Sequence, residues 1–227
     1  MKISIIIPAH NEEAYLENTL ESIKKQDFSD YETVVVCNGC TDKTEDVANR
    51  CWNDKMKVFS IPEANVSVAR NFGAKNSSGK LLLFLDADTL LKEGALNKIV
   101  EEFKEGVSVA TTKVEPDKKL FKYRLAMGFK NFYNSSGLYE GCSGALICKK
   151  DDFHSVGGYP EIKVKEHRKL TIALKKFGEY SVVGTSVITS MRRFDEWGLG
   201  KATGFWIKEW AKNYFGDLKK SDYEKIR

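Results

Sequence analysis

Long apolar runs, an even set of cysteines and a strong excess of one charge are all missing from this 227-residue sequence. Its N-terminal apolar stretch, residues 3–7, is much shorter than the core of a signal peptide or a membrane span. Five cysteines, an odd number, argue against a disulfide framework. Both features predict a cytoplasmic protein in a reducing compartment and leave open its attachment to the inner membrane surface.

The charge balance points to no particular partner. Lysine and arginine number 36 against 32 aspartate and glutamate residues, and the formal net charge of +4 is too small and too dispersed to indicate nucleic acid. We therefore expect no nucleic-acid partner and look for function in local sites. The length suits one large α/β domain and is short for two, so residues 1–227 are predicted to form a single domain.

Short apolar segments alternate with helical spacing through the first half of the chain. Strands are predicted at residues 3–7, 33–36, 58–61, 81–85 and 107–114. Between them, apolar residues spaced three and four apart, such as Leu16, Leu20 and Ile23, predict amphipathic helices. This alternation is typical of an α/β fold with a mainly parallel, doubly wound sheet and flanking helices. The second half is less regular, with a helical stretch at about residues 118–135 and a strand at 145–148.

Two carboxylates follow the most apolar of these strands. Asp86 and Asp88 come directly after residues 81–85, which read Leu-Leu-Leu-Phe-Leu. Ligands bind beyond the carboxyl ends of parallel strands, and two acids held close together there are costly without a cation. A hard divalent ion such as Mg²⁺, shared with substrate phosphates, would balance the charge. The alternative is structural: Asp86 caps the turn and Asp88 is the N-cap of a following helix.

Four short motifs strengthen the functional interpretation. Residues 5–13 (IIIPAHNEE), 38–44 (NGCTDKT), 69–74 (ARNFGA) and 85–89 (LDADT) occur in the order seen in family 2 glycosyltransferases, which the chain resembles over roughly its first two-fifths. Looser similarity continues at 141–145 (GCSGA), at 156–159 (VGGY) and around Glu166. The resemblance implies a GT-A fold, a nucleotide-diphospho-sugar donor, an Mg²⁺ or Mn²⁺ ion and inverting transfer to an acceptor hydroxyl. Residues 1–115 would bind the donor and 116–227 the acceptor.

The resemblance also implies roles for individual residues. Asp88 would bind the metal, and Asp86 would lie near the ribose. Arg70 would lie beside the base or the diphosphate, and Asn38 at the base. Family members commonly carry Asp at Cys37 or Asn38; because an amide both donates and accepts hydrogen bonds, a UDP-sugar is only weakly preferred over a GDP-sugar. The other donor-binding residues implied are Pro8, Ala9, Asn11, Glu13 and Ala87.

Inverting transfer requires a base within hydrogen-bond reach of the acceptor hydroxyl. In the family this base is the Asp of a Glu-Asp pair that opens a helix, and the matching residues here are Glu166 and His167. Glu166 keeps a family acid, whereas His167, in the Asp position, has the more suitable ordinary pKa. Both stay candidates, against the alternative of an inert, solvated first turn of a helix.

Further residues are predicted to meet the acceptor or a phosphate. Ser143 and Gly144 belong to the looser motif at 141–145. Arg192 and Arg193 offer paired guanidinium donors that suit phosphate oxygens, and related transferases carry a similar element. The alternative is that these arginines stack on surface aromatics such as Trp197.

Residues 202–215 combine aromatic side chains, such as Trp206 and Trp210, with lysines. A basic, Trp-rich amphipathic helix is typical of contact with an anionic membrane, which would bring the site to a lipid-linked acceptor rather than a free saccharide. The same stripe would also suit a buried core or the face of a homodimer.

Two other functions are consistent with parts of the sequence. Cys37 and Cys40 form a Cys-X-X-Cys pair between a predicted strand and a predicted helix, as in a thiol-disulfide oxidoreductase. That function would leave Asp86 and Asp88 without roles. The altered Glu-Asp pair is also consistent with a protein that binds a nucleotide sugar without transferring it.

Overall fold

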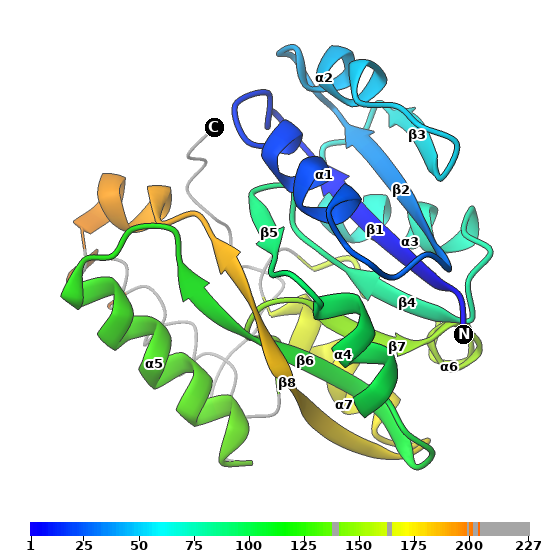
Figure 1. Cartoon of the computed structure of the whole chain (residues 1–227), viewed down its shortest axis with the longest axis vertical. Helices are drawn as coiled ribbons and strands as arrows, with labels where there is room; N and C mark the ends of the chain where they lie inside the picture. The colour runs from blue at the N-terminus through cyan, green and yellow to red at the C-terminus, as the bar shows by residue number, and fades with distance from the viewer. Residues whose placement is uncertain (138–140, 163–164, 199, 202–203, 205–227) are drawn as a thin grey trace.

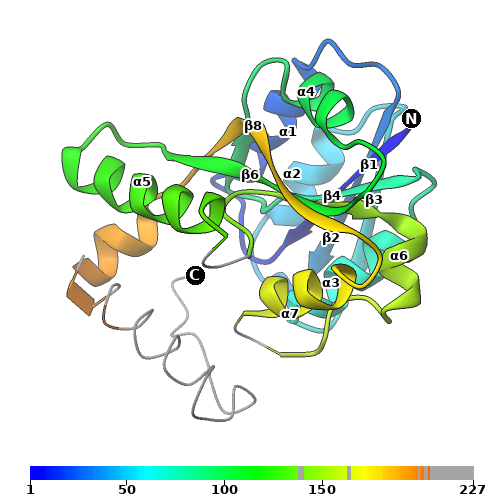
Figure 2. The ribbon, with the colours of Figure 1, turned by 90° about the horizontal axis from the view of Figure 1, so that it is seen from below.

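The computed structural model describes residues 1–137, 141–162, 165–198, 200–201 and 204. Its strands form one eight-stranded sheet with helices on both faces (Figures 1 and 2). The strands are β1 (Ile3–Ala9), β2 (Tyr31–Asn38), β3 (Met56–Ile61), β4 (Leu81–Phe84), β5 (Thr89–Leu91), β6 (Val107–Pro116), β7 (Leu146–Lys149) and β8 (Glu179–Thr189). The helices are α1 (Leu16–Lys24), α2 (Thr44–Arg50), α3 (Val66–Lys75), α4 (Ala95–Glu102), α5 (Phe121–Ser135), α6 (Lys150–Ser155) and α7 (Glu166–Leu174).

The sheet is mixed, with the strand order β3-β2-β1-β4-β7-β6-β8-β5. β1 pairs in parallel with β2 and β4, β2 with β3, and β6 with β8. β7 runs antiparallel to β4 and β6, and β5 antiparallel to β8. The predicted α/β fold with flanking helices is confirmed, and its continuous parallel part, β1 to β4, carries the four sequence motifs. β7 joins this part to β6, β8 and β5.

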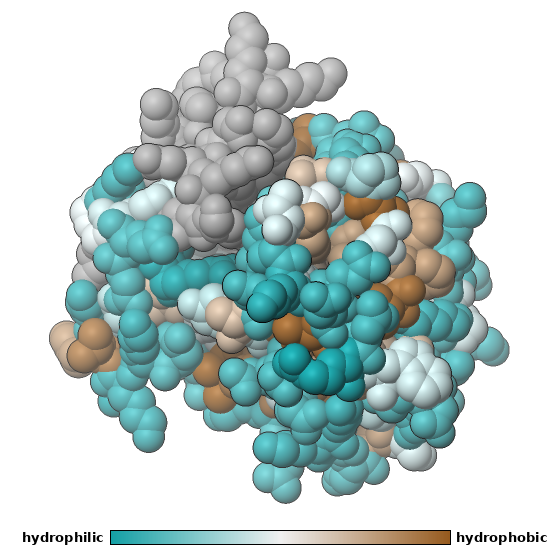
Figure 3. Space-filling model, turned by 90° about the horizontal axis from the view of Figure 1, so that it is seen from above, coloured by the Kyte–Doolittle hydropathy of each residue, from teal (hydrophilic) through white to brown (hydrophobic). Residues whose placement is uncertain are grey.

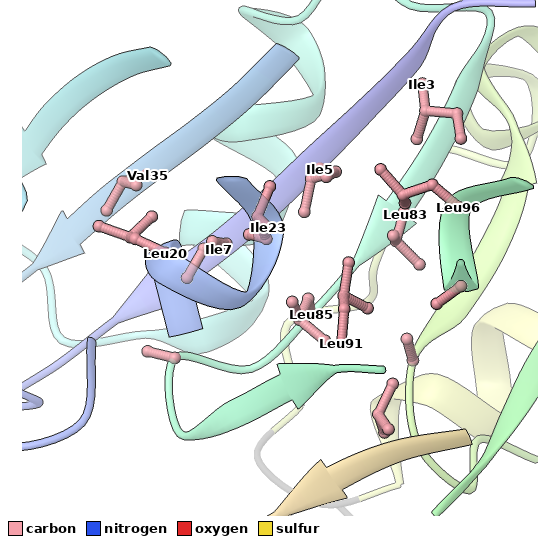
Figure 4. Packing of buried hydrophobic residues seen from close by; sticks show 14 of the residues in the cluster. Ile3, Ile5, Ile7, Leu20, Ile23, Val35, Leu83, Leu85, Leu91 and Leu96 are labelled. Carbon is pink, nitrogen blue, oxygen red and sulfur yellow. The ribbon is translucent and has the colours of Figure 1, made fainter. Parts of the chain in front are cut away.

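The central strands explain the unbroken apolar runs of the sequence. Every residue of β1 and β4 is buried, because helices cover both faces of the sheet. On one face, Ile5 and Ile7 of β1 point toward Leu20 and Ile23 of α1 (Figure 4). Helices α1, α2, α4 and α5 contribute to this cluster, whereas α3, α6 and α7 pack on the opposite face. The fold therefore fixes the strand ends rigidly.

Two local predictions need correction or extension. The chain after Asp88 forms the short strand β5, which pairs with β8, so Asp88 is not the N-cap of a helix. Three residues are too few to show a period, and only the long-range pairing with β8 reveals this strand. Apart from Gly204, the predicted amphipathic segment 202–215 lies outside the described residues. Within the described part, no helix combines the length and apolarity needed to cross a membrane.

Candidate active site

The carboxyl ends of β1, β2 and β4 meet at one edge of the sheet because these strands are parallel (Figure 1). Figure 3 views the molecule from the side toward which these ends point, and hydrophilic residues predominate on the coloured part of that face. All the predicted donor-binding residues except Arg70 lie at or directly after these three strand ends.

The loop after β1 is joined to the loop after β2. Asn11 adopts a left-handed backbone conformation with φ 54°, and its Oδ1 accepts a hydrogen bond from the Thr41 amide at 2.8 Å. Glu13 Oε2 accepts from the Lys43 amide at 3.0 Å. Two of the residues predicted along the nucleoside therefore also hold the shape of the loops around it.

The ends of β1 and β2 place Pro8, Ala9 and Asn38 next to one another, with Pro8 and Ala9 fully within the sheet. Asn38 is 3% exposed, and its backbone carbonyl lies 2.7 Å from Nδ1 of His10. The side-chain Oδ1 of Asn38 is buried and has no hydrogen-bond partner among the described residues. A buried amide oxygen without a partner is costly, so this position is suited to a ligand that donates a hydrogen bond.

Arg70, on α3, connects the end of β4 to the start of α7. Its Nη2 lies 2.8 Å from Asp86 Oδ1 and its Nη1 lies 2.8 Å from Glu166 Oε1. The side chain of Arg70 is only 3% exposed. Burial opposes the charged form, but the carboxylates of Asp86 and Glu166 hold the pKa of Arg70 above its ordinary value. Asp86, predicted to bind the nucleotide sugar, and Glu166, a candidate base, therefore form ion pairs with the same guanidinium.

Close packing of α3 on the sheet makes this arrangement possible. A Cβ atom on Gly73 would lie 2.5 Å from Cγ2 of Ile6, so glycine lets the helix approach β1 closely. The neighbouring Asn71 donates to the Tyr159 carbonyl at 2.9 Å and accepts from the Tyr159 amide at 2.8 Å. The Tyr159 ring then lies with its centroid 5.1 Å from the Arg70 guanidinium carbon. Tyr159 belongs to the VGGY segment, but no feature of the sequence indicates its contacts with Arg70 and His167.

Glu166 and His167 open α7, where both were expected, and both contact charged or polar groups of the site. The side chains are 11% and 21% exposed, so the alternative of a solvated, inert first turn is not what the structure shows. Nδ1 of His167 lies 2.9 Å from the Tyr159 hydroxyl, and Nε2 lies 3.6 Å from Glu166 Oε1. Burial and the nearby Arg70 guanidinium lower the pKa of His167 to about 4. The imidazole is therefore neutral at pH 7.

Arg192, which follows β8, contacts acidic residues in the segments after β1 and β4. Its guanidinium donates to both carboxylate oxygens of Glu12, at 2.7 and 2.6 Å, and its Nη2 lies 2.9 Å from Asp88 Oδ2. It also lies over the Tyr15 ring, 4.5 Å from the centroid. Glu12 was not singled out from the sequence although it belongs to the IIIPAHNEE motif. The 180 positions between Glu12 and Arg192 leave no local signal of their pairing.

The two aspartates at the end of β4 are therefore bound by side chains from elsewhere in the fold and are not occupied only by local caps. Asp86 keeps 53% of its side chain exposed, and Asp88 keeps 18%. In the described part of the chain, no three His, Cys, Asp or Glu side chains group as metal ligands. A divalent ion here would have to take its other ligands from water and substrate phosphates. Carboxylate oxygens with this exposure fit Mg²⁺ or Mn²⁺ on those terms.

The predicted acceptor residues divide between two places. Ser143 is buried: its amide donates to Thr111 Oγ1 at 3.0 Å and its carbonyl accepts from Lys130 Nζ at 2.7 Å. A Cβ on Gly144 would lie 2.5 Å from Thr112 Oγ1, which requires glycine there. Arg193 instead lies over Trp197, 5.6 Å from the ring centroid, as the alternative interpretation expected.

Three predicted site residues share one unusual property. The buried atoms Asn38 Oδ1, Arg70 Nε and Ser143 Oγ have no hydrogen-bond partner within the described residues. Native proteins leave few buried polar atoms unsatisfied, and those that remain often mark a site that a ligand completes. The three atoms come from β2, α3 and the segment before β7, so they indicate a polar ligand site drawn from both halves of the chain.

Cys37 and Cys40 lie beside Asn38 and, with Ile61 and Pro62, line a cleft of about 430 Å³. Both are free thiols. The closeness of the two thiols lowers the pKa of Cys40 and, together with burial, raises the pKa of Cys37. The two cysteines therefore belong to the segment around Asn38 that is predicted to contact the nucleotide base.

Comparison with known proteins gives these residues a context. A family model described as glycosyl transferase family 2 matches residues 4–152, more than half of the chain. A Campylobacter jejuni protein named GalNAc(5)-diNAcBac-PP-undecaprenol beta-1,3-glucosyltransferase is 31% identical over 109 residues, which cover 46% of this chain and 35% of that protein. Glycosyltransferase GlyA of Streptococcus pneumoniae is 26% identical over 205 residues, covering 88% and 27%. The chain spans about a third or less of the length of these relatives.

Solved structures confirm the predicted GT-A fold. The mannosyltransferase PcManGT of Pyrobaculum calidifontis, in complex with GDP-Man and Mn²⁺, has a TM-score of 0.72 at 16% identity, over 95% of this chain and 64% of that one. S. aureus TarS 1–349, in complex with UDP-GlcNAc, has a TM-score of 0.69 at 22% identity, over 84% and 58%. At these identities the likeness concerns the fold alone.

The lowered pKa of His167 predicts a pH-dependent stability. The folded state favours the neutral imidazole, so the stabilisation is fully present above the ordinary pKa of 6.5 and is lost as pH falls toward about 4. The free energy of unfolding should fall by about 3 kcal/mol between these two pKa values, and replacing His167 by Gln should remove this dependence. Urea unfolding at a series of pH values measures it. His154→Gln, at an exposed position, is the control, and equal slopes for both variants would contradict the assignment.

Proposed function

The chain belongs to glycosyl transferase family 2, and we propose that it is an enzyme that transfers a sugar from a nucleotide-diphospho-sugar to an acceptor hydroxyl with inversion. The observation that carries this proposal is the pair of carboxylates after β4, each bound by an arginine at the edge of the sheet. Acids, guanidinium groups and unsatisfied polar atoms within one site are the chemistry that a nucleoside diphosphate requires.

The donor would lie along the ends of β1, β2 and β4. Asn38 Oδ1, buried and without a partner among the described residues, is suited to accept an N–H of the base. Uracil and guanine both offer such a group, so we keep a UDP-sugar as the first choice and a GDP-sugar as the second. Asp86 would contact the ribose. Arg70 would donate a hydrogen bond to the diphosphate, for which its Nε, without a partner among the described residues, is available.

A divalent ion, Mg²⁺ or Mn²⁺, would be held by Asp88, with Asp86 close by, and would supply neutralisation of the departing nucleoside diphosphate. Arg192 already contacts Asp88 Oδ2. When a metal ion binds Asp88, this arginine must either share the carboxylate with the ion or move away from it. Glu12 holds both terminal nitrogens of Arg192 and would keep the guanidinium in place for a phosphate oxygen.

Either Glu166 or His167 would act as the base. The acceptor hydroxyl gives its proton to the base, its oxygen forms the new bond to the anomeric carbon, and the bond from that carbon to the diphosphate oxygen breaks. Which of the two residues can accept the proton depends on the tautomer of His167, that is, on which ring nitrogen carries the hydrogen. If Tyr159 donates to Nδ1, then Nε2 carries the proton and Glu166 is the acceptor; the opposite tautomer leaves Nε2 able to accept.

Residues 116–227 would bind the acceptor, either a saccharide or a lipid-linked molecule. Ser143, Gly144 and Arg193 are the candidates for contact with it, together with Arg192. The Campylobacter relative is named for an undecaprenol-linked substrate, which supports a lipid-linked acceptor as one option. The basic aromatic segment 202–215 would then contact the membrane.

Donor and metal binding should be coupled through Asp88. With a UDP-sugar and Mn²⁺ near a hundred times their dissociation constants, we expect stabilisation by about 3 kcal/mol and a melting temperature raised by roughly 5–10 °C. Asp88→Asn should lose the part of this rise that depends on Mn²⁺, whereas Asp151→Asn, at an exposed position on α6, should keep it. A thermal-shift panel with UDP- and GDP-sugars measures both. An unchanged Mn²⁺ response in Asp88→Asn would remove this residue from the metal site.

The base should be identified by turnover and its pH dependence. Loss of a general base lowers kcat by about 10²- to 10⁴-fold, so one of Glu166→Gln and His167→Gln should fall by this amount, with Lys169→Gln on the exposed side of α7 as the control. If His167 is the base, kcat/KM should fall as pH drops through about 4, because the protonated imidazole cannot accept. Donor-induced thermal shifts check that each variant still binds the donor. Near-normal kcat in both variants would contradict either assignment.

A further inference from the structure

Helix α5 carries an apolar face that the rest of the described chain leaves uncovered. Phe121, Leu125, Phe129 and Phe132 are 79%, 64%, 68% and 66% exposed. With Leu120 before the helix, they make up five of the nine large hydrophobic residues exposed in the described part of the chain. Single exposed apolar residues are common on protein surfaces, but several of them on one helix form a contiguous patch. Such a patch is typical of an interaction surface. We call these four side chains the α5 apolar face.

The opposite side of α5 already anchors the helix. Tyr123 and Met127 are buried in the core cluster on β6 and β8, and Asn131 exchanges hydrogen bonds of 2.8 and 2.9 Å with the backbone of Val114. At about 100° per residue, the buried residues and the α5 apolar face lie on opposite sides of the helix. In both ribbon views α5 lies at the outer edge of the molecule (Figures 1 and 2). The uncovered face is therefore not needed to hold the fold together.

Positive charge borders this face. The sequence of α5 contains Lys122, Arg124 and Lys130 and has no Asp or Glu. At helical spacing Lys122 and Arg124 fall on the two borders of the α5 apolar face. Lys119 also precedes the helix, whereas the neighbouring Lys118 forms an ion pair with Asp195. Lys130 lies on the inner side, where its Nζ donates to the Ser143 carbonyl. The helix thus joins a basic, aromatic outer surface to a segment of the candidate site.

We propose that the α5 apolar face lies on an anionic lipid membrane, with its phenylalanines and Leu125 at the boundary between headgroups and acyl chains. Helices with this combination of aromatic residues and flanking lysine or arginine bind in the plane of such surfaces. A second copy of the chain is disfavoured as the partner, because a symmetric pairing of this helix would bring basic residues together without an acid on α5 to balance them. The membrane contact does not depend on the proposed sugar transfer.

The contact is tested by sedimentation of the whole 227-residue chain with vesicles of phosphatidylcholine alone and with added phosphatidylglycerol. We expect binding to the anionic vesicles that weakens with salt. The double variant Phe129→Ser/Phe132→Ser should lower the binding constant at least about tenfold, as should Lys122→Glu/Arg124→Glu. Trp52→Ser removes a similarly exposed aromatic residue, 61% exposed, from the end of α2 and should bind as the wild type does.

A stability measurement and the oligomeric state separate this membrane contact from misfolding and from self-association. The free energy of unfolding in urea should change by no more than about 0.5 kcal/mol in the Phe and Lys/Arg variants, which shows that the fold is intact. The proposal is overturned if the wild-type chain binds no vesicle, or if it binds and the Phe variant binds equally, which would assign the contact to another segment such as 202–215. It is also overturned if the chain self-associates and Phe129→Ser/Phe132→Ser makes it monomeric without any vesicle binding.

Discussion

The ion pairs of Arg70 hold the candidate site together. One guanidinium, almost fully buried, contacts Asp86 at the end of the central strand β4 and Glu166 at the start of α7. Arg70 and Glu166 are buried, whereas Asp86 keeps 53% of its side chain exposed. Burying the guanidinium is favourable only if its carboxylate partners remain close, so the positions of α3, α7 and the end of β4 are constrained by one another. The donor-side aspartate and the candidate base are consequently fixed in relation to each other before any substrate binds.

Arg192 has the same role on the other carboxylate. It contacts Asp88 and, through both terminal nitrogens, the buried Glu12, and so ties β8 to the loop after β1. Each aspartate thereby contacts an arginine within the protein, but each guanidinium is shared with a second carboxylate, so two positive charges face four negative ones. These arginines explain how two acids persist at the tip of an apolar strand. A diphosphate with its cation would exchange partners in the same ion pairs.

The parts of this arrangement that depend on short stretches of sequence could be predicted. Apolar runs gave the central strands, and the position of Asp86 and Asp88 after one of them indicated the site. Contacts between distant residues could not be predicted, because no periodicity links Glu12 to Arg192 or Arg70 to Tyr159. The same limit explains the missed strand β5, whose three residues are ordered by pairing with β8. The Lys-, Tyr- and Phe-rich sequence of residues 118–135 indicated a helix, but not that one apolar side of α5 would be left uncovered by the rest of the described chain.

The claim that Arg70 links the two halves of the site is tested most directly by a double-mutant cycle between Arg70 and Glu166. The free energy of unfolding is measured for Arg70→Met, for Glu166→Gln and for the double variant. Removing the buried cation alone should cost about 3–5 kcal/mol, since two carboxylates lose their partner. The two substitutions should be coupled by about 1–3 kcal/mol, so that the double variant loses less than the sum. Additivity to within about 0.5 kcal/mol would contradict the account.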